Sequence, residues 1–174
     1  MSVRKVLASF SVGIAMILSS GGLYAEVDPS SKYRVLSTEE SGLNISTITT
    51  FFDQAEVSIT RGNLDQAIEN LKKARTVSNL LLTYYRDING SFRGIDALIP
   101  REMSKKNRDV IQLLAEANMR LATIHRTKGE PELAVPLLVD VVKILTPVKT
   151  QGAKAYQQLV ELGFVDTPYR AAPN

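Results

Sequence analysis

The stretch RGNLDQAIENL at residues 61–71 is followed 67 residues later by the similar stretch KGEPELAVPLL at residues 128–138. In each, a glycine follows a basic residue, and apolar residues spaced by three and four come after it. Glycine readily adopts the left-handed backbone conformation that ends many α-helices, and apolar residues at this spacing form one face of a helix. Both stretches therefore predict a helix, a tight turn at Gly62 or Gly129, and a second helix running back along the first.

Apolar residues at helical spacing predict an all-α fold of about five helices. The expected helices cover residues 45–61, 64–88, 131–145 and 152–162, with a further one that carries residues 110–125 and ends at Lys128-Gly129. Glycine, proline and polar residues at 89–100 predict a break between the second and third helices. Pro136 has no amide hydrogen, so the fourth helix is expected either to kink near its start or to begin closer to Val135.

The similarity between the two turns extends to residues 51–78 and 118–145. Small residues recur at matching places, which are Ala55 and Ala122 in the first helix of each pair and Ala67 and Ala134 in the second. Small side chains let two antiparallel helices approach closely. In this pattern the chain resembles the tetratricopeptide repeat family. The resemblance implies antiparallel helix-turn-helix pairs stacked as a short tetratricopeptide-like array; a bundle of about five helices is the alternative.

Residues 1–25 have the three parts of a Sec-type signal peptide: the positive Arg4 and Lys5, the apolar residues 6–18, and small residues before Ala25, where we expect cleavage. An uncleaved membrane anchor is the alternative, since residues 6–23 approach the length that crosses a bilayer. Cleavage predicts a periplasmic, lumenal or secreted protein that is not expected to contact a membrane. The predicted layout continues with a flexible lead at 26–43, a helical domain at 44–163 and an extended tail at 164–174.

The composition limits the available chemistry. The chain has no cysteine and one histidine, which excludes disulfides, zinc fingers, iron–sulfur clusters, a cysteine nucleophile and a multi-histidine metal site. We expect no catalytic, cofactor-binding or metal-binding residues. Without Arg4 and Lys5, 19 basic residues face 18 acidic ones. The exported chain therefore lacks the basic surplus typical of a nucleic-acid binder, and we expect no nucleic acid as a partner.

Basic residues gather around the predicted break: Arg86, Arg93, Arg101, Lys105, Lys106 and Arg108. Four acidic residues dilute them, and the same segment carries the apolar docking candidates Phe92, Ile95, Leu98 and Ile99. A basic patch of this kind attracts an acidic partner or contacts anionic lipid. We predict that Arg86, Phe92, Arg93, Arg101, Lys105, Lys106 and Arg108 bind another protein that has an acidic surface. The alternative is a long loop that folds back on the helices and leaves its charges in water.

Together these features predict an exported, non-catalytic helical-repeat protein that acts as a protein–protein interaction or assembly module. Two other functions remain open at this point. The first is a small helical-bundle enzyme that uses His125 with Glu116, although the ordinary interpretation of His125 is a packed, hydrogen-bonded side chain. The second is a signal-anchored, membrane-associated protein.

Overall fold

A computed structural model describes Leu36 and residues 42–170. These residues form five α-helices and no strand: α1 (Ile45–Thr60), α2 (Leu64–Ser91), α3 (Leu98–Thr127), α4 (Pro131–Leu145) and α5 (Thr150–Glu161). The all-α prediction is therefore confirmed for this part of the chain. The predicted signal peptide at 1–25 and most of the lead at 26–43 lie outside the described residues.

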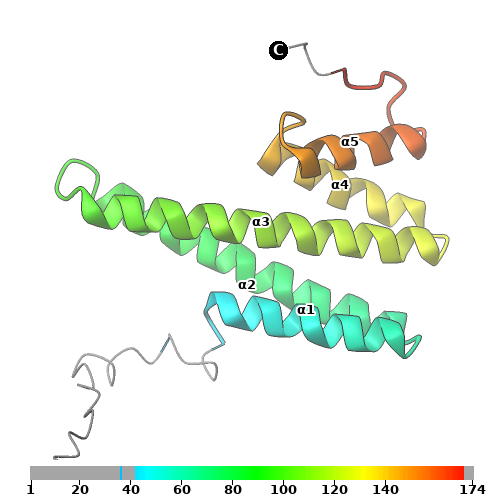
Figure 1. Cartoon of the computed structure of the whole chain (residues 1–174), viewed down its shortest axis with the longest axis horizontal. Coiled ribbons are helices and arrows are strands. Elements are labelled where there is room, and N and C mark those ends of the chain that lie inside the picture. The colour runs from blue at the N-terminus through cyan, green and yellow to red at the C-terminus, as the bar shows by residue number, and fades with distance from the viewer. Residues whose placement is uncertain (1–35, 37–41, 171–174) are drawn as a thin grey trace, which may run out of the picture.

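The helices stack in the order of the sequence (Figure 1). Each packs against the next one along the chain, and α1 also touches α3. Successive helices run in opposite directions, with α1, α3 and α5 in the layer nearer the viewer and α2 and α4 behind them. The molecule is thus a row of antiparallel helices in two staggered layers.

Both predicted glycine turns are present, and their hydrogen bonds match. Gly62 and Gly129 have φ values of +74° and +75°. The amide of the residue after each glycine donates to the carbonyl five residues earlier, from Asn63 to Ser58 and from Glu130 to His125, at 2.9 Å in both cases. This is the Schellman arrangement, in which a left-handed residue satisfies the last carbonyls of a helix. The two turns therefore reverse the chain in the same way.

The core runs through all five helices. Its fully buried side chains include Ile48, Leu71, Val110, Leu121, Leu138 and Val141. The four alanines expected at the helix contacts, Ala55, Ala67, Ala122 and Ala134, are all completely buried. Burying one such leucine or isoleucine stabilises a fold by about 1.5–3 kcal/mol, and the alanines allow the helices to come close enough for that burial.

The predicted break at 89–100 is wrong in its extent. Helix α2 continues through Gly90 and Ser91, and α3 begins at Leu98, so only residues 92–97 connect them. Pro100 lies in the first turn of α3, where a helix needs no amide hydrogen from that residue. The Asp96 carboxylate accepts hydrogen bonds from the amides of Leu98 and Ile99, at 2.7 and 2.8 Å, and thereby caps the helix.

The fourth helix also differs from one of the two expectations. It begins at Pro131 and contains Pro136, so a start near Val135 is wrong. Pro131 suits the first turn because its fixed φ is already helical. Pro136 leaves the carbonyl of Glu132 without its helical donor, and Glu132 is exposed in the first turn of α4, where water can replace the donor.

Helices α2 and α3 are much longer than their neighbours. They have 28 and 30 residues, whereas α1 and α4 have 16 and 15. The excess of α2 over α1 corresponds to about 18 Å at the helical rise of about 1.5 Å per residue. The α2–α3 pair therefore projects past the other helices (Figure 1). We call its projecting part, residues 80–108, the hairpin end.

The glycine turns give a test with an internal control. We expect Gly129→Ala to lower the free energy of unfolding by about 1 kcal/mol, because a side chain disfavours the left-handed conformation. Gly90→Ala should raise it by up to about 1 kcal/mol, because Gly90 is helical and alanine is the better helix former. An added Cβ meets nothing within 4 Å at either site, so only backbone conformation differs. Urea unfolding, monitored by circular dichroism, measures the free energy of unfolding of both variants. If the two substitutions changed it in the same direction, the assignment of Gly129 to a left-handed turn and Gly90 to a helix would be contradicted.

Candidate interaction site

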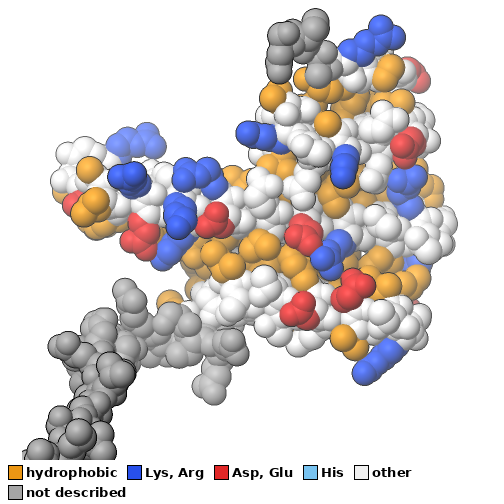
Figure 2. Space-filling model, viewed as in Figure 1, with side chains coloured by type: hydrophobic (Ala, Val, Ile, Leu, Met, Phe, Trp, Pro, Cys, Tyr) orange, Lys and Arg blue, Asp and Glu red, His pale blue; other side chains and the backbone are white. Residues whose placement is uncertain are grey.

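The hairpin end exposes large apolar side chains that no other described element covers. Leu80, Tyr84 and Ile88 follow one another at intervals of four along α2 and are all exposed. At the tip, Ile95 and Leu98 have 78% and 73% of their surface exposed, and Phe92 lies beside them in the connection. Figure 2 shows apolar side chains at the projecting tip among basic ones. An apolar patch rimmed by charge is typical of a surface that binds a partner.

Most of the predicted basic residues are free of ion pairs. Arg101, Lys105 and Arg108 have the spacing that places three side chains on one face of α3, and all three are exposed. Neither these three nor Arg86 and Arg93 form an ion pair with any described residue. Their charges therefore face solvent and can act on an approaching molecule.

Lys106 is the exception among the predicted residues. Its Nζ lies 2.8 Å from the Oε1 of Glu102, one turn earlier on α3, and 5.9 Å from the centre of the Tyr85 ring. Ile99, one of the four apolar docking candidates, is half-buried. Of the acidic residues nearby, Asp96 caps α3 and Glu102 pairs with Lys106. Asp87 and Asp109 are exposed. The hairpin end keeps a basic surface because its six basic residues outnumber these four acidic ones.

Between α2 and α3 at the hairpin end lies a cleft of about 230 Å³. Its walls are formed by Tyr85, Arg86, Asn89, Arg93, Met103, Ser104 and Asn107. The Asn89 amide donates hydrogen bonds to the carbonyl of Pro100 and to Oγ of Ser104, both at 2.8 Å, and so joins the two helices. The structure therefore brings Arg86 and Arg93 together around one cleft. Asn89, Ser104 and Asn107 have no distinctive sequence signal, and the sequence did not indicate them as site residues.

His125 and Glu116, the pair of the enzyme hypothesis, belong to separate arrangements. Glu116 pairs with Arg120 on the same helix, at 2.6 and 3.0 Å. The two residues are nine positions apart on α3, which corresponds to about 13.5 Å at the helical rise. His125 has only 12% of its side chain exposed, and its Nδ1 lies 2.8 Å from Oε2 of Glu130. The structure gives this histidine the role of a packed, hydrogen-bonded residue beside a turn.

A network of charged side chains joins the two glycine turns. Lys128 Nζ lies 2.6 Å from Oδ1 of Asp65 at the start of α2 and 3.7 Å from Oε1 of Glu130. The hydrogen bond with Lys128 lowers the pKa of Asp65, and the same bond raises the pKa of Lys128. The hydrogen bond with His125 lowers the pKa of Glu130 below its usual value of 4.5. These contacts hold together the end of the molecule that carries the two glycine turns. We call it the turn end, and it lies opposite the hairpin end.

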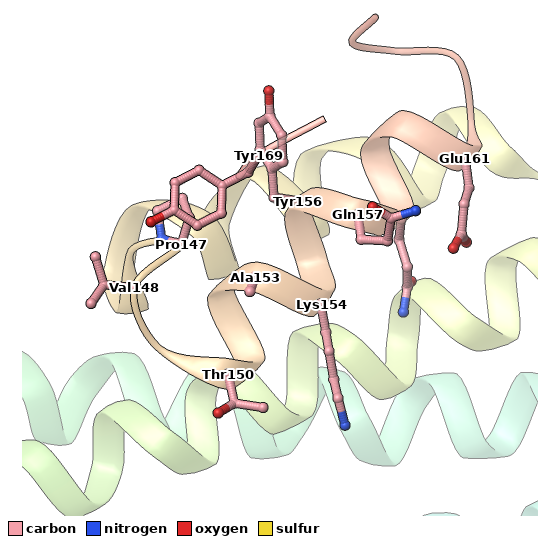
Figure 3. A pocket seen from close by; sticks show the side chains of 10 residues that line it. Pro147, Val148, Thr150, Ala153, Lys154, Tyr156, Gln157, Glu161 and Tyr169 are labelled. Atoms are coloured by element: carbon pink, nitrogen blue, oxygen red, sulfur yellow. The ribbon is translucent and has the colours of Figure 1, made fainter. Parts of the chain in front are cut away.

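Two further hollows lie outside the hairpin end. A broad depression of about 700 Å³ is formed by α5, the α4–α5 connection and the tail, and Figure 3 shows Tyr156 and Tyr169 at its rim. The Tyr156 hydroxyl donates to the carbonyl of Thr167 at 2.8 Å, so the tail folds back onto α5. A groove of about 330 Å³ lies between α1 and α3, lined by Ile59, Met119, Ile124 and other residues.

Comparison with known proteins does not place the chain in a family. No protein-family model matches the chain, and searches of curated proteins and of solved structures find no match either. Within the described residues, no cluster of three or more potential metal ligands occurs. None of the helices described there has both the length and the apolar character that crossing a bilayer requires.

The turn network predicts a dependence of stability on pH. Because its folded-state pKa is lowered, Glu130 should stabilise the fold above pH 4.5 and lose that contribution as the pH falls through the folded-state value. We therefore expect Glu130→Gln to lower the Tm at pH 7, and the difference from the parent protein should shrink towards pH 2–3. Melting curves across this range measure it. Asp53→Asn, an exposed change on α1, is the control, and an equal effect of both changes at all pH values would contradict the prediction.

Proposed function

We propose that the protein is an exported, non-catalytic interaction module that binds an acidic partner protein through the hairpin end. One observation carries this proposal: the hairpin end projects past α1 and α4 with its apolar side chains exposed beside arginines and a lysine that form no ion pair with any residue the structure describes. Export rests on the signal-peptide pattern at residues 1–25, which lies outside the described residues.

The two kinds of side chain would serve different steps of binding. Basic side chains draw an acidic partner towards the surface and select against a basic one, whereas buried aromatic and aliphatic side chains supply most of the affinity. Tyr84 and Phe92 are the aromatic anchors available at the hairpin end, and both are exposed. The stack of helices behind them acts as a rigid support, so binding orders little of the chain and the entropic cost of association stays low.

The resemblance to tetratricopeptide repeats supports the same function. The matching glycine turns, the buried alanines and the two-layer stack are features that such arrays use to hold an extended binding surface. In this proposal the stack positions the hairpin end.

Charge reversal tests the hairpin end. We expect the triple change Arg93→Glu, Arg101→Glu and Lys105→Glu to abolish capture of partner proteins from the exported fraction, as identified by mass spectrometry. Lys106 is left unchanged because it pairs with Glu102. The matched control reverses Lys143, Lys149 and Lys154, three exposed lysines in and between α4 and α5, and alters the net charge equally. Both proteins should keep the helical circular dichroism of the parent. Equal loss of capture in both, or retention in both, would overturn the proposal.

The export part of the proposal has its own test. Cleavage after Ala25 predicts that Edman sequencing or terminal-peptide mass spectrometry of the exported protein begins at Glu26. A mature form that keeps residues 6–23 and sediments with membranes would favour the signal-anchored alternative instead.

A further inference from the structure

The cleft between α2 and α3 contains donors for an anionic group and no carboxylate. Its lining includes the guanidinium groups of Arg86 and Arg93, the hydroxyl of Ser104 and the amide of Asn107. Guanidinium groups bind carboxylates and phosphates through two parallel N–H donors, which makes arginine the preferred residue for such groups. Three other arginines of the described chain already hold carboxylates: Arg75 pairs with Asp140, Arg120 with Glu116, and Arg126 with Glu161. Arg86 and Arg93, like Arg101 and Arg108, have no such partner among the described residues.

The wall of the cleft is fixed by hydrogen bonds. Asn89 donates to Ser104 Oγ and to the Pro100 carbonyl, so the first turns of α3 are tied to the last turns of α2. The Ser104 hydroxyl accepts one of these bonds and still has its own hydrogen to donate. The volume of about 230 Å³ is below that of typical cofactor or drug pockets but is enough for one side chain.

One polar atom of the lining lacks a hydrogen bond. The Oδ1 of Asn107 is buried and has no partner among the described residues. A buried acceptor of this kind is unfavourable until a donor reaches it. Because less than 1 Å² of this oxygen is accessible, a donor in the cleft reaches it only after the Asn107 side chain turns towards the cleft. A free phosphate or sulfate ion supplies mainly acceptors, whereas a peptide that carries a carboxylate also has backbone N–H groups to donate. The set of two guanidinium groups, a hydroxyl and an unsatisfied acceptor therefore fits an acidic peptide segment better than an inorganic anion.

We infer that this cleft binds a glutamate or aspartate side chain presented by the partner protein, with Arg86 and Arg93 on the carboxylate and Asn107 on the adjacent peptide backbone. The inference rests on the proposed function, because the same hairpin end is the docking surface. Phe92 lies between the two arginines in the sequence, at the end of α2, and would cover the residues next to the bound acid. The cleft would then fix the position of the partner that the outer basic residues attract.

The direct test is an NMR titration of the full chain at low salt with acetylated, amidated hexaglutamate, using hexaglutamine as the uncharged control. We expect hexaglutamate to shift the Nε–H signals of Arg86 and Arg93 and the side-chain amide of Asn107, and hexaglutamine to leave them in place. Arg86→Ala with Arg93→Ala should weaken binding at least tenfold. Arg101→Ala with Arg108→Ala, which removes the same charge from the outer face of α3, should weaken it less than threefold. Equal weakening by both pairs, or no shift at Asn107, would overturn the inference.

Two further arms separate the sources of the effect. Inorganic phosphate that shifts the same signals at the same concentration as hexaglutamate would show a general anion site and overturn the peptide assignment. In the capture experiment, loss of the partner on Arg86→Ala with Arg93→Ala supports the cleft. If the variant with Arg86→Ala and Arg93→Ala still captures the partner, while the charge reversal of Arg93, Arg101 and Lys105 abolishes capture, the inference about the cleft is overturned. The proposed function is then left intact. Circular dichroism and Tm of every variant confirm that it is folded.

Discussion

The packing of α2 against α3 along their whole length is the constraint on which the rest of the structure depends. Its core side chains extend from Leu71 near the glycine turns to Leu82 on α2 and Val110 on α3, and Met103 is buried apart from them, nearer the tip. Because this interface reaches beyond α1 and α4, the pair can project without their support, and the Asn89 bonds to Pro100 and Ser104 secure its far part. Without that interface the outer turns of the hairpin end would fray, since its segments of α2 and α3, of about a dozen residues each, are too short to be stable as isolated helices in water.

Local chemistry explains why part of the fold could be predicted from the sequence. The turns at Gly62 and Gly129 depend on a glycine and on the helices beside it, all within a few residues. The break at 89–100 was overestimated because Gly90 weakens a helix only slightly, and the contact with α3 offsets that weakness. Likewise, nothing near Gly152 in the sequence indicates that an added Cβ there would collide with the backbone of Thr146. The contact of α2 with α3 and the close approach of Gly152 to Thr146, six residues earlier, both depend on how the chain folds in three dimensions.

Part of the candidate site could also be predicted from the sequence, and part of it could not. The basic cluster could be predicted because all its members lie within one stretch of 23 residues, from Arg86 to Arg108. The cleft could not be predicted from the sequence, because Asn89, Ser104 and Asn107 are ordinary polar residues that come together only when α2 and α3 pair. The ion pair of Lys106 with Glu102 follows from their spacing of four, and it shows that a sequence cluster overstates the number of free charges.

The two ends of the α2–α3 pair use charge in opposite ways. At the turn end, Asp65, Lys128, Glu130 and His125 satisfy one another, so their charges hold the turns together and are little available to a partner. At the hairpin end, Arg86, Arg93, Arg101, Lys105 and Arg108 have no such partners within Leu36 and residues 42–170. Basic and acidic residues are nearly equal in number beyond the predicted signal peptide, so the positive surface at the hairpin end arises from their distribution and not from an overall surplus. A local field of this kind acts over roughly the Debye length, about 8–10 Å at physiological salt, so in the proposed function it would orient an acidic partner towards the tip before the apolar side chains make contact.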